Sequence, residues 1–210
     1  MVSAQQKIAG LLEQLIGLKV SSIGSSTMNR VLSIRMKTVG IDNVEKYFDK
    51  LTGSRLELRK LVEDVVIPET WFFRDQEPFR YLTEYVLQAE KKLSGGVLRI
   101  LSLPCSTGEE PYSIAMTMLQ AGLTPASFYI DAVDVSERAL ALAREGLYGE
   151  NSFRVKDLSF RDSYFVSTEE GYALKQVVHD KVRFIQGNLL QTGFVETLGC
   201  YDVVFCRNVL

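Results

Sequence analysis

The sequence has few of the residues that carry common metal and acid-base chemistry. It contains one histidine, His179, and three cysteines, Cys105, Cys200 and Cys206, in 210 residues. An odd number of cysteines without metal-ligand spacing argues against a disulfide framework and against a zinc site. We therefore expect a reducing compartment and no metal. Because His179 lies outside every motif described below, we interpret it as structural.

Long apolar runs and a targeting segment are also missing. No apolar stretch approaches the roughly 20 residues that a helix needs to cross a bilayer. The start of the chain, MVSAQQKIAG, lacks the charged and apolar regions of a signal peptide. These absences predict a cytoplasmic protein without membrane insertion, and we expect a monomer.

The net charge of -2 gives no reason to expect nucleic acid as the main partner. The charge is nevertheless uneven. Residues 1 to 68 carry 10 basic and 7 acidic side chains, a net +3, and residues 69 to 210 carry 14 and 19, a net -5. A mildly basic N-terminal part could meet an acidic protein surface, although a solvated helix face explains the charge alone more simply.

Residues 1 to about 90 are predicted to be wholly helical. A second helix should begin near Ser26 or Thr27, either of which could cap it. On this helix Arg30 and Lys37 fall opposite the apolar stripe, on an exposed face that could bind carboxylates. A further helix from about residue 78 ends in the run KKLSGG, which marks a domain boundary. The boundary predicts a helical domain over 1–90 and a second domain over 91–210.

Beyond this boundary the sequence alternates strands and helices, as in an α/β domain with a parallel sheet and helices on its faces. Strands are predicted at residues 97–103, 128–133, 182–185 and 202–206. A hairpin within about 158–181 should form a small inserted antiparallel β-subdomain. The fourth strand is apolar on both faces and would be an exposed edge, so we expect the sheet to be C-terminally incomplete and the chain to be part of a longer protein.

The turn after the first strand, LSLPCSTGEEPYS, is the most informative stretch. A dinucleotide fold would need G-x-G-x-x-G here, and only Gly108 is present. Glu109 and Glu110 would repel phosphate, so the turn favours a cationic or hydroxyl-bearing ligand such as S-adenosylmethionine. A turn with two solvated carboxylates is an equally good interpretation of this stretch. Asp134, at the end of the second strand, could hold ribose hydroxyls or cap a helix.

Four motifs, VIPETWFFRDQEPF, LSLPCSTGEEPYSIAM, AVDVSERALALAREGLY and YDVVFCRNVL, together resemble the chemotaxis receptor glutamate methyltransferases of bacteria, the CheR type. The resemblance covers residues 25 to 210. It implies a Rossmann-like class I methyltransferase sheet with a helical N-terminal domain, and S-adenosylmethionine as cofactor with S-adenosylhomocysteine as product. It also implies that the partners are the cytoplasmic signalling helices of a methyl-accepting chemoreceptor-like protein.

The same resemblance implies roles for individual residues. The expected cofactor contacts are Thr70, Arg74, Glu109, Glu110, Asp134, Asn188, Leu189, Arg207 and Asn208. Arg74 is also the catalytic candidate, Arg30 and Lys37 would dock the receptor helix, and no metal is expected. Two departures stand out: Pro68 replaces an asparagine found in many members, and the loop 167–171 is short, which argues against tethering to a receptor C-terminal peptide.

The implied reaction needs no general base, because a glutamate with a pKa of about 4.3 is already ionised at neutral pH. Alignment of the reactants and exclusion of water would supply the catalysis. An interaction module that binds S-adenosylmethionine or a receptor without turnover is the main alternative. A small-molecule or nucleic-acid methyltransferase is another, although the acidic body argues against nucleic acid. A nicotinamide oxidoreductase would need the missing glycine pattern.

Overall fold

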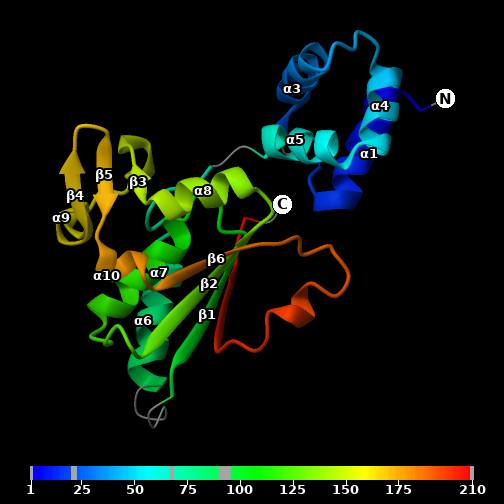
Figure 1. Ribbon diagram of the computed structural model, residues 1–210. Coiled ribbons are helices and arrows are strands. Elements are labelled where there is room, and N and C mark those ends of the chain that lie inside the picture. The colour runs from blue at the N-terminus through cyan, green and yellow to red at the C-terminus, as the bar shows by residue number, and fades with distance from the viewer. Residues whose placement is uncertain (1, 20–22, 67–68, 90–95, 209–210) are drawn as a thin grey trace. The chain divides into compact units, whose positions relative to one another are not determined.

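The computed structural model describes residues 2–19, 23–66, 69–89 and 96–208. These residues form two compact units (Figure 1). The first contains the N-terminal helices and residues 188–197, and the second contains residues 69–187 and 198–208. Within the described residues, no helix combines the length and the apolar character that crossing a membrane would require.

The first unit contains the helices α1 (Ala4–Ile16), α3 (Ser25–Thr38), α4 (Val44–Gly53) and α5 (Arg55–Val65). Side-chain caps start three of them, since Ser3, Asn43 and Ser54 each accept a hydrogen bond from a first-turn amide. The cap predicted for the second helix is wrong. That helix, α3, begins at Ser25 after Gly24, without a side-chain cap.

A buried ion pair joins the helices of this unit. Arg35 of α3 donates from Nε and Nη2 to the carboxylate of Glu57 on α5, at 3.0 and 2.7 Å, and Tyr47 of α4 donates to the same carboxylate at 3.0 Å. Burial alone would raise the pKa of Glu57, but the hydrogen bonds from Arg35 and Tyr47 outweigh it and lower that pKa. The apolar stripe predicted for α3 therefore shares its buried face with a charged residue.

The second unit is built on a four-stranded parallel sheet with the order β6-β2-β1-β7. Its strands are β1 (Leu98–Leu103), β2 (Phe128–Asp134), β6 (Val182–Gln186) and β7 (Val203–Cys206), which confirms the four predicted strands. The chain moves from β1 to β2 and β6 on one side, and β7 then pairs with the other side of β1. Parallel sheets bind ligands at such a reversal, beyond the carboxyl ends of the strands.

The helices α6 (Glu77–Ala89), α7 (Glu109–Gln120) and α8 (Glu137–Glu145) cover one face of this sheet (Figure 1). Phe79 and Leu82 of α6 are buried in one core with Ile100 of β1 and Ile114 of α7. Because α6 packs on the sheet in this way, the division between the units lies near residue 67 rather than near residue 90, where the glycine run suggested it.

The inserted subdomain is a three-stranded antiparallel sheet of β3 (Leu147–Tyr148), β4 (Phe165–Thr168) and β5 (Gly171–Leu174), in the order β3-β5-β4. The short helices α9 (Ser159–Tyr164) and α10 (Gln176–His179) flank it, and Glu150–Ser152 form a 3-10 turn. The predicted hairpin is β4 and β5. The third strand, β3, has only two residues and carries no periodicity that a sequence could reveal.

Candidate active site at the carboxyl ends of the strands

The turn between β1 and α7 is shaped by Gly108. This residue has φ 92° and immediately precedes α7, which starts at Glu109, two residues before Pro111. A Cβ at Gly108 would lie 2.9 Å from the Cβ of Ala143 and 3.0 Å from the hydroxyl of Tyr148. Both the backbone conformation and the close approach of neighbouring side chains therefore require glycine here.

Asp134 fixes the backbone on the other side of this turn. Its two carboxylate oxygens accept hydrogen bonds from the amides of Ser106, at 2.8 Å, and Ser136, at 2.9 Å. Ser106 has φ 49°, a left-handed conformation that the bond to Asp134 holds in place. Asp134 thus connects the end of β2 to the turn and to the start of α8, and its contact with ribose hydroxyls stays a prediction.

The first two residues of α7 bring two acidic side chains into the protein. Glu109 is 3% exposed, and its carboxylate accepts from the hydroxyls of Thr107, at 2.7 Å, and Ser152, at 2.9 Å. Glu110 accepts from the hydroxyl of Ser102 at 2.8 Å and from Arg207 at 3.1 Å. Burial raises the pKa of both groups, and these hydrogen bonds oppose the shift. The interpretation as two solvated carboxylates is therefore wrong.

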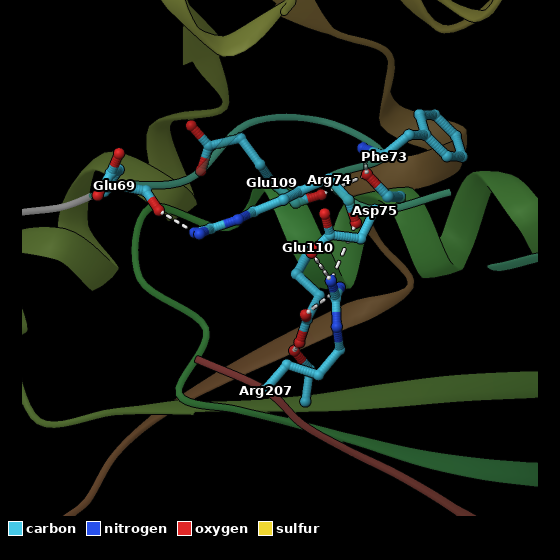
Figure 2. A network of polar contacts seen from close by, with 9 residues as sticks. Glu69, Phe73, Arg74, Asp75, Glu109, Glu110 and Arg207 are labelled. Carbon is cyan, nitrogen blue, oxygen red and sulfur yellow. Dashed lines mark hydrogen bonds and ion pairs between the residues drawn. The ribbon is translucent and has the colours of Figure 1, made fainter. Parts of the chain in front are cut away.

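Arg207 joins the end of β7 to the segment of residues 69–75. Its Nη1 donates to Glu110, and its Nη2 donates to the backbone oxygen of Arg74, at 3.1 Å, and to the carboxylate of Asp75, at 2.7 Å. Figure 2 shows its side chain reaching Glu110 and Asp75, while the Arg74 side chain extends away toward Glu69. Arg207 therefore holds protein groups in this structure, and a direct contact with a cofactor stays a prediction.

Arg74 is held by backbone and aromatic contacts. Its Nη1 donates to the backbone oxygen of Glu69 at 2.6 Å, and its guanidinium lies 4.5 Å from the centre of the Trp71 ring. The neighbouring Phe73 and Asp75 both have φ 54°. Each such left-handed residue costs on the order of 1 kcal/mol or more, and such strain tends to gather at functional sites. The contacts of Arg207 with this segment help to maintain it.

The expected cofactor residues fall into two groups. Seven lie in the second unit, in or directly beside the network just described: Thr70, Arg74, Glu109, Glu110, Asp134, Arg207 and Asn208. Asn188 and Leu189 belong to the first unit, where the Asn188 amide donates to the backbone oxygen of Leu15 at 2.6 Å. Their position along the adenine stays a prediction, and Pro68 lies outside the described residues.

The two residues expected to dock a receptor also lie in the first unit. Arg30 and Lys37 are both exposed on α3. Lys37 lines a hollow of about 630 Å³ together with residues that include Asn29 and Ser33. In the ranges that the structure describes, no three histidine, cysteine or acidic side chains are grouped so that they could hold a metal ion.

Sequence reasoning missed the hydroxyl groups that hold the acidic pair. Ser102 lies inside β1, and Ser152 lies 43 positions after Glu109, to which its hydroxyl donates. Serine is common in turns and strand ends, so neither residue stands out in a single sequence. Ser102 is buried, and its presence in an otherwise apolar strand was the one feature of the sequence that could have indicated its role.

Comparison with known proteins gives two family matches. Residues 68–210 match the SAM binding domain of the CheR methyltransferases, and residues 4–66 match their all-alpha domain. The chain is 49% identical over 95% of its length to the probable biofilm formation methyltransferase WspC of Pseudomonas aeruginosa, and 41% identical over 98% to that of Pseudomonas putida. It covers 48% and 49% of those proteins, about half their length. Chemotaxis protein methyltransferase 1 of Pseudomonas aeruginosa is 33% identical to this chain. The match covers 95% of this chain and 75% of the length of that methyltransferase.

The close packing at Gly108 leads to a prediction with a matched control. Gly108→Ala should destabilise the second unit by about 2 to 4 kcal/mol, since it adds a clash to the strain of a left-handed alanine. Gly122→Ala has nearly the same φ, 90°, and open space around it, so it should cost only about 1 to 2 kcal/mol. Urea unfolding followed by Trp71 fluorescence measures both, and equal losses would show that the close approach is unimportant.

Burial of Glu109 predicts a specific pH dependence. Since the pKa of Glu109 is raised in the fold, its ionised form destabilises the second unit above that pKa, and this penalty disappears as the pH falls through it toward about 4.3. Glu109→Gln retains hydrogen bonding to Thr107 and Ser152 without the charge. Its stability relative to the unmodified protein should therefore fall as the pH is lowered from 7, measured by urea unfolding, whereas a constant difference would contradict the assignment.

Proposed function

Because the chain belongs to the CheR methyltransferase family, we propose that its second unit binds S-adenosylmethionine at the end of the sheet. We further propose that it transfers the methyl group to glutamate side chains of a chemoreceptor-like signalling protein, forming methyl esters. The names of the relatives, which include chemotaxis and biofilm methyltransferases, support a signalling substrate. The helical partners and the cytoplasmic location are part of this proposal.

The observation that carries the proposal is the acidic character of the turn. Two carboxylates, the buried Glu109 and the half-buried Glu110, stand where a dinucleotide fold presents glycines and amides to a pyrophosphate. Two like charges 4 Å apart repel by about 4 kcal/mol at an effective dielectric constant of 20. The site should therefore repel a phosphate and attract a ligand with positive groups. S-adenosylmethionine has two such groups, its ammonium and its sulfonium.

The surrounding residues fit the remaining parts of this ligand. Asp134, at the end of β2, would accept hydrogen bonds from the ribose hydroxyls. Arg74 carries a guanidinium with no acidic partner among the described residues, so it could pair with the carboxylate of the methionine part. Thr70 and Asn208 lie next to these groups in the chain, and Asn188 with Leu189 would lie along the adenine.

S-adenosylmethionine, held by Arg74 and Asp134 as proposed, would supply a methyl group carried on a positively charged sulfur, and the acceptor would be a carboxylate oxygen of the substrate. No proton has to move, which agrees with a site that contains no histidine among the described residues. The negative charge of the carboxylate and the positive charge of the sulfonium would both disappear in such a transfer. The protein therefore has to align the two partners and exclude water that would stabilise the separated charges.

Titration calorimetry with S-adenosylmethionine and S-adenosylhomocysteine tests the site. Asp134→Ala and Arg74→Ala should each weaken binding at least about tenfold, the equivalent of 1.4 kcal/mol. The control is Asp131→Asn, which changes another buried carboxylate of β2, bound by Arg183 and Tyr201. It should lower stability without changing the affinity of the folded protein. No binding by the folded unmodified chain, or equal effects of all three changes, would contradict the proposed site.

A further inference from the structure

We propose that Arg154 is the residue that selects an acidic side chain as the methyl acceptor. The inference rests on the proposed function, because it names the substrate-recognition residue of that same site. The position of Arg154 in the inserted subdomain, with its guanidinium beside the same tryptophan ring as that of Arg74, carries it.

Two arginines lie against the ring of Trp71. The guanidinium of Arg74 is 4.5 Å from the ring centre, and that of Arg154 is 5.1 Å from it. Such contacts stabilise a cation while leaving its N–H groups available for an anion. Among the described residues neither guanidinium forms an ion pair. The one hydrogen bond that Arg154 donates to the described part of the chain is from Nε to the backbone oxygen of Asn151, at 2.9 Å.

Contacts of the two preceding residues hold Arg154 near Glu109. Ser152, two residues earlier, donates its hydroxyl to Glu109, and its backbone oxygen accepts from the amide of Phe72 at 2.8 Å. The ring of Phe153 stacks on that of Phe72 at 5.2 Å. The chain on the N-terminal side of Arg154 is therefore attached both to the start of α7 and to the segment that carries Trp71. Arg154 itself is exposed.

The negative charge of Glu109 and Glu110 means that an acidic substrate needs a cation on the solvent side of the site to bind. Glu109 and Glu110 favour a positive methyl donor, and for the same reason they repel a substrate carboxylate. Arg207 cannot relieve this repulsion while it binds Glu110, Asp75 and the backbone of Arg74. Arg154 is exposed, its charge lowers the pKa of Glu109, and it forms no ion pair within 4 Å among the described residues. A contact from it to one carboxylate oxygen would leave the other oxygen free to attack.

Arg161 provides a matched control in the same subdomain. Its guanidinium also lies over aromatic rings, 4.3 Å from the centre of Tyr172 and 5.4 Å from that of Phe153. Unlike Arg154, it is paired with an acid, since its Nη1 donates to the carboxylate of Glu150 at 3.2 Å. Removing either arginine changes the net charge equally, but of the two it is Arg154 whose charge acts on Glu109 and whose guanidinium forms no ion pair among the described residues.

The test compares two fluorescent helical peptides that differ only in carrying glutamate or glutamine at the acceptor positions. Dissociation constants are measured with the full chain, with and without S-adenosylhomocysteine. The unmodified chain should prefer the glutamate peptide by about 10- to 100-fold, as expected for a charge-assisted hydrogen bond. Arg154→Gln should remove most of this preference, Arg154→Lys should retain part of it, and Arg161→Gln should retain it in full. Affinity for S-adenosylhomocysteine should be the same in all four proteins.

Three results would overturn the inference. They are an unmodified chain without preference for glutamate, an Arg154→Gln variant that keeps the preference, and an equal loss in Arg161→Gln, which would indicate surface charge alone. A failure of the unmodified chain to bind S-adenosylhomocysteine would instead refute the proposed function. The titrations without S-adenosylhomocysteine would then still decide whether Arg154 selects an acidic side chain.

Discussion

The withdrawal of two adjacent carboxylates from solvent at the start of α7, with Glu109 buried and Glu110 half-buried, is the constraint on which the rest of the site depends. Burying ionised groups is costly unless they are hydrogen-bonded, and Glu109 and Glu110 are supplied with donors from four different parts of the chain. The positive end of the helix macrodipole also favours them. The sheet, the inserted subdomain and the segment of residues 69–75 are thereby connected through these two carboxylates. The negative charge of the site is concentrated there.

In this arrangement the two proposed reactants would be recognised by side chains of opposite charge. In the proposed function Glu109 and Glu110 would favour a methyl donor that carries positive groups, and the exposed Arg154 would favour an acidic acceptor. Arg207 lies between these two roles, since it neutralises part of the charge of Glu110 and holds the strained segment that carries Arg74. The proposed transfer to a carboxylate would remove one positive and one negative charge together, so a site with separated regions of opposite charge would bring both reactants together without an acid or a base.

Much of the fold could be predicted from the sequence, because the spacing of apolar residues indicates directly which face of a helix or strand is buried. The four parallel strands, most helix limits and the hairpin of the inserted subdomain followed from apolar patterns. The domain boundary did not, because a glycine-rich run marks a loop but does not tell on which side a helix packs. Arg35 was missed since a charged residue on a buried face depends on a partner, Glu57, that is distant in sequence. Within the site, the turn and its two acids were recognisable, but the hydroxyls of Ser102 and Ser152 and the position of Arg154 beside Trp71 depend on tertiary contacts.

An assay of methyl transfer tests the proposed carboxylate methylation most directly. The chain is incubated with S-adenosylmethionine labelled in the methyl group and with a chemoreceptor signalling-helix fragment, in one form with glutamates and in another with glutamines at the acceptor positions. Label that appears only in the glutamate form, and that mild base releases as methanol, is the predicted result because a glutamyl methyl ester is base-labile. Absence of label in the glutamate form, or base-stable label in both, would contradict the assignment of this site to carboxylate methylation.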